Sequence, residues 1–141
     1  MKVSDILQKK GNAVISVNSN TTVLDALKIM SEKNIGALLV IDDGKLTGIF
    51  SERDYARKVV LKGKASADTA VEDIMTENPF TVQPGDSIEI CMGIMSNKHI
   101  RHLPVVNNDT VAGMISIGDV VTAIIESQKE TIDHLKSYIS Q

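Results

Sequence analysis

The chain has 141 residues, of which 43% are hydrophobic and 23% charged, and its net charge is −3. This composition is typical of a soluble globular protein of one domain, or of two small domains that share a core. The negative charge excludes a non-specific binder of nucleic acid or anionic membranes. No apolar run is long enough to cross a bilayer or to serve as a secretory signal. The single cysteine, Cys91, excludes an internal disulfide, so a cytoplasmic protein is expected.

The first half of the chain predicts a β-α-β-β-α unit. A short strand over 15–17 precedes a helix over 22–33, where Thr22 and Asp25 resemble a capping box. The apolar run 37–41 is typical of a buried strand, and the turn at 42–45 leads to a return strand over 46–50. A further helix begins near Ser51, and a polar linker over 62–68 follows it.

The second half predicts the same unit again. Its elements are a strand over 80–82, a helix over 86–98 capped by Asp86 with Glu89, strands over 103–106 and 111–115, and a helix from Ser116. Without gaps, 15–56 and 80–121 are identical at 11 of 42 positions. The segment VSDIL (3–7) also matches VEDIM (71–75) once extra residues around Gly11–Ala13 are allowed. The chain is therefore an internal repeat.

Both repeats contain Gly-x-x-Ser-x-x-Asp at the turn from strand to helix, as GIFSERD (48–54) and GMISIGD (113–119). One interpretation is structural, because a serine at the N-cap and an acid at N3 stabilise a helix start. The other is a nucleotide site, since the helix amides and a serine hydroxyl bind phosphate and a carboxylate binds ribose hydroxyls. The two interpretations are compatible.

Several other residues also have both a structural and a functional interpretation. His99, Arg101 and His102 precede a strand, and form either a solvated strand start or the cationic wall of a phosphate site. Arg53 follows the first motif, on a basic helix face or as a further phosphate contact. Cys91 lies on an apolar helix stripe and is expected in the core. A metal site is not expected, because the two histidines have no acid or thiolate nearby.

Two such units, with IRHLPVV (100–106) in the second, resemble a tandem pair of CBS domains (named for cystathionine beta-synthase), the Bateman module. SERDYARKVV and SIGDVV look most like the small stand-alone CBS-pair proteins of bacteria and plant organelles. The resemblance covers 3–127 and implies an α/β (α+β) fold in which the two repeats pack sheet to sheet with pseudo-two-fold symmetry. The expected domains are 1–67, 68–127 and a helical tail, 128–141, which docks onto the module or pairs with a second chain.

The resemblance also implies a non-enzymatic regulatory module that binds an adenine nucleotide in the cleft between the repeats. AMP is the expected ligand, with ATP, ADP and NAD as alternatives, and no metal is required. The expected partners are a second copy in a homodimer, through helices such as 51–62 and 117–128, and a regulated protein. A small nucleotide-processing enzyme and a purely structural dimerisation module are the alternatives. The residues assigned to the nucleotide are Ser51, Asp54, Ser116, Asp119, Arg101, His102, Arg53, Ile100 and Thr81.

The two sites are expected to be unequal. In a two-fold pair, the strand start of one repeat lies beside the helix start of the other, so Ser51 and Asp54 would face Arg101 and His102. The first repeat has NIGALLVI (34–41) where the second has HIRHLPVV (99–106), so the second motif would lack a cationic partner. The first motif should then bind phosphate more strongly.

Overall fold

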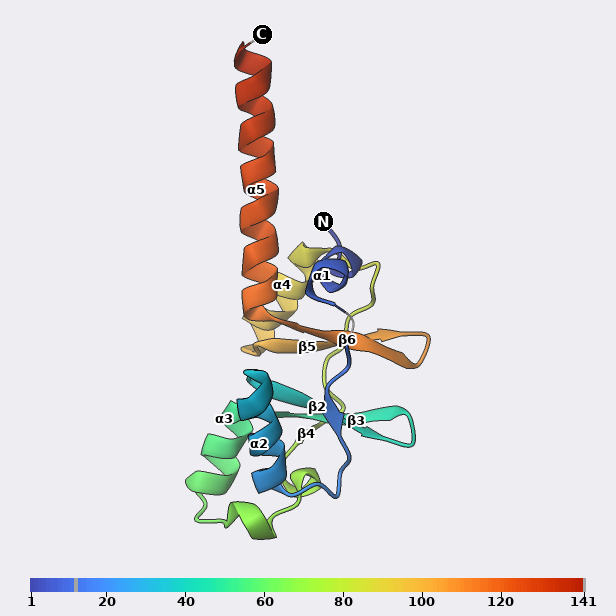
Figure 1. Cartoon of the computed structure of the whole chain (residues 1–141), viewed down its shortest axis with the longest axis vertical. Helices are drawn as coiled ribbons and strands as arrows, with labels where there is room; N and C mark the ends of the chain where they lie inside the picture. The colour runs from blue at the N-terminus through green and yellow to red at the C-terminus, as the bar shows by residue number, and fades with distance from the viewer. Residues whose placement is uncertain (12, 141) are drawn as a thin grey trace. The chain divides into compact units, whose positions relative to one another are not determined.

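A computed structural model describes residues 1–11 and 13–140, so Asn12 in the expected insertion and Gln141 at the end of the expected tail lie outside the described residues. The chain forms two compact units with mixed α/β structure, which confirms the predicted fold class (Figure 1). Unit 1 comprises 1–12, 81–107 and 112–141, and unit 2 comprises 13–80 and 108–111. Each unit has its own cluster of buried apolar side chains.

Unit 2 is built on a four-stranded sheet with the order β1-β2-β3-β4. Its strands are β1 (Ser16–Val17), β2 (Ala37–Asp42), β3 (Lys45–Ser51) and β4 (Thr76–Glu77). β1 runs parallel to β2, whereas β3 is antiparallel to both of its neighbours. The β2–β3 turn contains Asp43 and Gly44, both with positive φ, as a tight hairpin requires. The helices are α2 (Val23–Lys33) and the short α3 (Glu52–Tyr55), which continues as a π-helical segment, η1 (Ala56–Val60).

Unit 1 repeats this plan with a smaller sheet. Strands β5 (His102–Asn107) and β6 (Thr110–Ser116) form a hairpin, and the helices are α1 (Val3–Lys10), α4 (Ile88–Lys98) and α5 (Ile117–Ser140). Beside β5, Val82 forms a single parallel bridge with Val105. The predicted strand over 80–82 is therefore reduced to one residue. Pro79 and Pro84 lie on either side of it, and prolines have no amide with which to extend a ladder.

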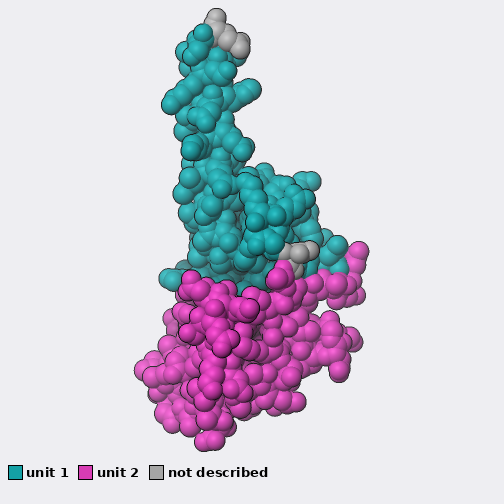
Figure 2. Space-filling model, in the orientation of Figure 1, with its two compact units in different colours: residues 1–12, 81–107, 112–141 teal, residues 13–80, 108–111 magenta. Residues whose placement is uncertain are grey.

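The two compact units, which Figure 2 shows in different colours, do not coincide with the sequence repeats. Each repeat contributes a short N-terminal arm to the unit that holds most of the other repeat. The first arm is α1, whose Val3, Ile6 and Leu7 are buried in the core of unit 1. The second arm comprises the 3-10 turn η3 (Val71–Asp73) and β4, and it buries Val71 and Ile74 in the core of unit 2. Another 3-10 turn, η2 (Ser66–Asp68), interrupts the expected linker.

The capping prediction is right for α2 and wrong for α4. Thr22 caps α2, since its Oγ1 accepts a hydrogen bond from the Asp25 amide at 3.1 Å. In α4 the cap is Ser87, which accepts from the Ile90 amide at 3.2 Å. Asp86 lies one residue earlier and accepts instead from the Gln83 amide at 2.8 Å, so it closes the preceding Pro-Gly turn.

Helix α5 is one uninterrupted helix of 24 residues that contains the whole described part of the expected tail. Every residue from 128 to 140 is exposed, so the tail does not dock onto its own chain within the described residues. Figure 1 shows the red half of α5 extending beyond the other elements of unit 1. Although α5 is long, no helix of the described chain has the apolar length that crossing a bilayer requires.

Candidate functional site

The first Ser-Asp motif forms a complete capping box at the turn from β3 to α3. The Asp54 amide donates to Ser51 Oγ at 3.2 Å, and the Ser51 amide donates to Asp54 Oδ2 at 3.0 Å. The Ser51 hydroxyl also donates to Asp54 Oδ2, at 3.1 Å. The helix cap that the structural interpretation predicts is thus formed in the first repeat.

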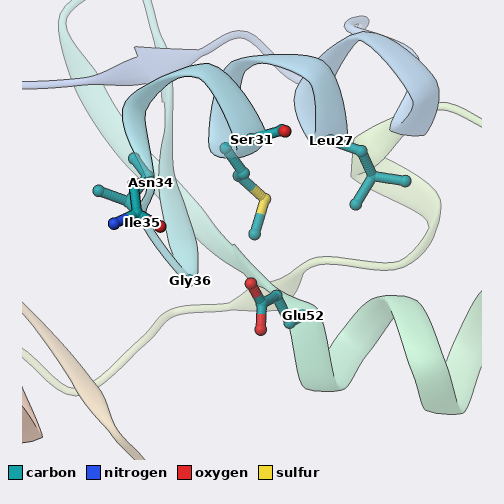
Figure 3. A pocket seen from close by; sticks show the side chains of 7 residues that line it. Leu27, Ser31, Asn34, Ile35, Gly36 and Glu52 are labelled. Atoms are coloured by element: carbon teal, nitrogen blue, oxygen red, sulfur yellow. The ribbon is translucent and has the colours of Figure 1, made fainter.

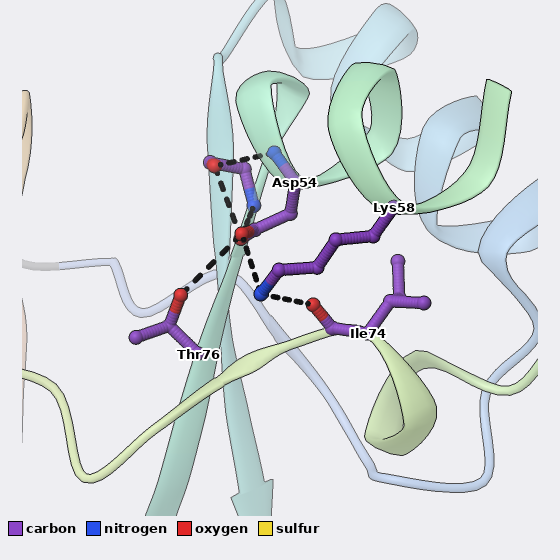
Figure 4. A network of polar contacts seen from close by, with 5 residues as sticks. Asp54, Lys58, Ile74 and Thr76 are labelled. Carbon is purple, nitrogen blue, oxygen red and sulfur yellow. Dashed lines mark hydrogen bonds and ion pairs between the residues drawn. The ribbon is translucent and has the colours of Figure 1, made fainter. Parts of the chain in front are cut away.

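Two further groups hold the buried carboxylate of Asp54 (Figure 4). Lys58 lies one turn along the helix, with its Nζ at 3.2 Å from Asp54 Oδ1 and at 3.1 Å from the carbonyl oxygen of Ile74. Thr76, from the second arm, donates its hydroxyl hydrogen bond to Asp54 Oδ1 at 3.4 Å. Asp54 therefore accepts bonds from its own helix start, from the next turn and from β4.

The second motif has the same capping box but a different lysine. The Asp119 amide donates to Ser116 Oγ at 3.2 Å, and the Ser116 amide donates to Asp119 Oδ2 at 2.8 Å. The lysine is Lys10, from the end of α1, whose Nζ is 2.8 Å from Asp119 Oδ2 and 2.9 Å from the carbonyl oxygen of Met114. Met114 of β6 corresponds to Ile49 of β3, which pairs with β4 in unit 2. In unit 1, the ammonium of Lys10 therefore binds β6 at the position where β4 pairs with β3 in unit 2.

These contacts set the ionisation of Asp119. Burial by itself raises the pKa of this carboxyl, but the hydrogen bonds from Lys10 and from the Ser116 amide, together with the charge of Lys10, lower it more. The net pKa lies below the ordinary value for aspartate. Asp119 is accordingly an anion at neutral pH, the form that can accept hydrogen bonds from two hydroxyl groups.

The motif glycines are explained by the arms. A Cβ on Gly48 would lie 2.6 Å from the Sδ of Met75 and 2.9 Å from the carbonyl oxygen of Thr76. A Cβ on Gly113 would lie 3.0 Å from the Cδ2 of Leu7. Leu7 and Met75 occupy corresponding positions in the two arms. Close approach was predicted at these glycines, and the group that approaches is the arm of the other repeat.

Unit 2 also has a shallow pocket of about 370 Å³ between the C-terminal half of α2 and the start of α3 (Figure 3). Its apolar lining is Leu27, Met30 and Ile35, and its rim includes Ser31 and Glu52. The Glu52 amide donates to the carbonyl oxygen of Gly36 at 3.1 Å, which ties the start of β2 to the motif turn. The pocket therefore borders the residue that follows Ser51.

The basic residues predicted near the second motif lie at the start of β5. Within unit 1, the Ile117 amide donates to the carbonyl oxygen of Arg101 at 2.8 Å, so the exposed Arg101 adjoins the Ser116 turn of its own repeat. His102 is half-buried as the first residue of β5, and Ile100 packs against the core of unit 1. The pairing of Arg101 and His102 with the first motif stays a prediction.

The remaining predicted residues lie in both units, at the surface or in the core. Thr81 is exposed directly before Val82, and Arg53 is exposed on α3 between the two motif residues. Cys91 is buried in the core of unit 1 as predicted, and burial raises the pKa of its thiol to about 11. No cluster of three or more potential metal ligands occurs among the described residues.

Sequence reasoning did not find Lys10 and Thr76 as partners of the motif aspartates. Lys58 could have been found, because a lysine four residues after an aspartate lies on the same helix face. Lys10 precedes Asp119 by 109 positions, and only the folded chain brings the two together.

Comparisons with known proteins agree with this arrangement. The family model described as CBS domain matches residues 3–61 and 71–126. The CBS domain-containing protein CBSX3, mitochondrial, of Arabidopsis thaliana is 39% identical over 97% of this chain and 71% of its own. A solved protein with CBS domains from Burkholderia ambifaria is 45% identical, with a TM-score of 0.87 over 91% of this chain and 96% of that one.

A third relative is the CBS domain pair of protein MJ0100, solved in complex with 5′-methylthioadenosine and S-adenosyl-L-methionine. It is 29% identical, with a TM-score of 0.80 over 90% of this chain and 98% of that one. The two matched ranges correspond to the two repeats, arms included. The chain belongs to the CBS-domain family, as a tandem pair of CBS domains.

Proposed function

We propose that this protein is a regulatory module, without catalytic activity, that binds an adenosine-containing ligand at Ser51 and Asp54 and at Ser116 and Asp119. The observation that carries the proposal is the repeated turn, which presents a serine hydroxyl and an aspartate carboxylate at a strand-to-helix junction in each unit. The serine suits a phosphate or another polar group, and the carboxylate suits the two hydroxyls of a ribose. The MJ0100 pair, which carries two adenosine derivatives, supports this ligand class.

AMP is the ligand that we propose first, with ATP, ADP and NAD as alternatives. Its phosphate would be bound by Arg101 and His102, with Arg53, Ile100 and Thr81 completing the site. Ligand binding would change how the module meets a regulated protein. The lone buried cysteine is compatible with a reducing compartment, and we propose the cytoplasm.

The test of the ribose contact uses asparagine rather than alanine. Asp54 is buried and caps its helix, so alanine would remove structural bonds together with the ligand contact. Asp54→Asn with Asp119→Asn keeps one acceptor oxygen for each cap but loses the carboxylate. By calorimetry, we expect the affinity for AMP to fall roughly 10-fold to 150-fold at each site, the scale of a hydrogen bond to a charged group. The control is Asp25→Asn, at the same helix position outside the motifs.

Adenosine and AMP together test the phosphate contact. Arg101→Ala should weaken AMP roughly tenfold or more and leave adenosine unchanged, because the two ligands differ only in the phosphate. Equal binding of AMP by the wild type and both sets of variants would contradict the site. Turnover of AMP or ATP by the purified protein would favour the enzyme alternative.

We also propose a homodimer through η1 and the first turns of α5. Four large apolar side chains on these segments, counting the C-cap residue of η1, are exposed in the single chain: Val60 (54%), Leu61 (77%), Val121 (41%) and Ile125 (59%). Exposed apolar side chains that gather on helices are typical of association surfaces. Light scattering over a dilution series should report a dimer for the wild type and a weaker dimer for Leu61→Asp, and a wild-type mass of 15.3 kDa would contradict the proposal.

A further inference from the structure

From Ile125 to Ile139, α5 carries an apolar stripe that no part of its own unit covers. Its large side chains are strongly exposed, with values of 59% for Ile125, 52% for Ile132, 54% for Leu135 and 80% for Ile139. Their separations are seven, three and four residues. In the heptad notation for coiled coils, the isoleucines occupy three successive a positions, and Leu135 occupies a d position.

We propose that this segment, 125–139, pairs with the same segment of a second copy as a parallel, two-stranded coiled coil. The pattern of branching points to this form, because isoleucine at a with leucine at d favours a parallel pair of helices. The heptad repeat is narrower than the apolar face that a helix presents to a globular core. The segment is about 22 Å long at 1.5 Å per residue.

The one polar residue of the stripe also fits a second copy. Gln128 occupies the d position between Ile125 and Ile132 and is exposed in the single chain. In a parallel pair in register, Gln128 lies opposite Gln128 of the other copy. An amide is both donor and acceptor, so the two side chains can satisfy each other. An apolar groove on an unrelated protein would leave that amide unpaired.

The flanking charges oppose the antiparallel arrangement. Lys129 and Lys136 are at e positions, whereas the g positions hold Thr131 and Tyr138. In an antiparallel pair, e positions face e positions, so the lysines of the two chains would face each other. In a parallel pair, each lysine faces an uncharged g residue, over which its methylene stem can lie.

A membrane surface is a poorer occupant of the stripe. The polar side of the segment carries Glu126, Glu130 and Asp133 against two lysines, so it is not basic. Helices that lie on anionic membranes are rich in lysine and arginine on that side. The stripe therefore favours a protein helix whose apolar residues have the same spacing, and a second copy of the segment supplies such a helix.

The test is disulfide formation in the full chain at a single added cysteine. Gln128→Cys at the d position should cross-link two copies under mild oxidation, at least tenfold faster than Ser127→Cys, which points away from the seam at c. The natural Cys91 should give no cross-link, because it is buried and its thiol pKa is raised to about 11. Equal rates for the two variants would overturn the parallel pairing.

A charge placed in the seam gives an independent readout. Ile132→Asp should raise the dimer dissociation constant by at least about 100-fold, because each pair loses two buried isoleucines. It should also abolish cross-linking of Gln128→Cys. Ser137→Asp adds the same charge at an outward f position and should change neither property. Both substituted residues are exposed in the single chain, so the fold should survive, which circular dichroism checks. If Gln128→Cys cross-links at the same rate in combination with Ile132→Asp as with Ser137→Asp, the proposal is wrong. That outcome is independent of whether nucleotide binding at the motifs is established.

Discussion

Asp54 and Asp119 occupy equivalent positions, yet each is held by a lysine from a different part of the chain. Lys58 comes from the same helix as Asp54, whereas Lys10 comes from the arm that packs on unit 1. A ligand that binds Asp119 must share the carboxylate with Lys10 or displace it. At Asp54 the lysine comes from the same helical segment, and its Nζ also binds the carbonyl oxygen of Ile74. Under the proposed function, this difference would make the two ligand sites unequal for a reason that the comparison of the two repeats did not include.

The lysine contact predicts a measurable pH dependence. Lys10→Met should raise the pKa of the Asp119 carboxyl, because the hydrogen bond and the positive charge that lower it are removed. A carboxyl with a lowered folded pKa stabilises the folded protein above its unfolded pKa of about 3.9, and this contribution is lost as the pH falls through the folded value. The variant should therefore lose about 1 kcal/mol or less at pH 7, since Lys10 is partly exposed, and almost nothing at pH 2.

Carboxyl NMR of the two proteins measures the Asp119 pKa directly, and urea unfolding at the two pH values measures the free energy. Lys9→Met is the matched control, because Lys9 neighbours Lys10 but pairs with Glu126 at 2.6 Å. An unchanged Asp119 pKa in Lys10→Met would show that the ion pair does not persist in solution.

At the scale of elements, each motif glycine makes room for the arm that packs against it. Gly48→Ala places a Cβ at 2.9 Å from the backbone oxygen of Thr76, and backbone in β4 cannot move without breaking its pairing with β3. A Cβ at Gly113 would contact only the Cδ2 of Leu7, at 3.0 Å, but the φ of Gly113 is +158°, which residues with a side chain rarely adopt. We expect Gly48→Ala to lower the free energy of unfolding by about 1–3 kcal/mol through its clash with β4, whereas Gly113→Ala combines a milder contact with backbone strain. Thermal unfolding of Gly48→Ala measures this, and an unchanged stability would contradict the packing argument.

The elements that were predicted correctly are those whose own residues indicate them clearly. The strand pairs 37–41 with 46–50 and 103–106 with 111–115 have continuous apolar runs and turn residues, and all four strands are present. The cap of α4 was predicted one residue too early, at Asp86, because aspartate and serine both suit an N-cap. The repeat alignment places Ser87 opposite Thr22, the true cap of α2, so that comparison held the missing signal.

The arm contacts could not be predicted in the same way, because they join residues far apart in the chain. VSDIL and VEDIM match each other in sequence. Nothing local in either segment indicates that it packs in the core formed mainly by the other repeat. The arms also differ, since α1 continues as a helix to Lys10, whereas the second arm extends as β4 before Pro79. A helix tends to end before a proline. The contact between Lys10 and Asp119 depends on this difference between the arms, so it could not be predicted either.

For the whole molecule, the arm exchange determines which parts of the chain can fold alone. A fragment cut at the sequence repeat, 1–67, keeps the first arm but loses Val71 and Ile74, which are 0% and 1% exposed in the core of unit 2. It also loses β4 and leaves Val3, Ile6 and Leu7 without their core. A fragment of nearly equal length, 13–80, keeps every buried residue of the unit 2 cluster.

We therefore expect 13–80 to unfold cooperatively on heating and 1–67 to show no cooperative transition. Full burial of a valine or isoleucine side chain stabilises a protein by about 1.5–3 kcal/mol, so the loss of two such residues removes much of the stability of a domain this small. Circular dichroism melts of the two fragments make the comparison, and Ile74→Ala in 13–80 should reproduce part of the defect at a cost of about 2–5 kcal/mol. Similar melts for both fragments would contradict this argument, because they would show that the arms do not decide which fragment folds.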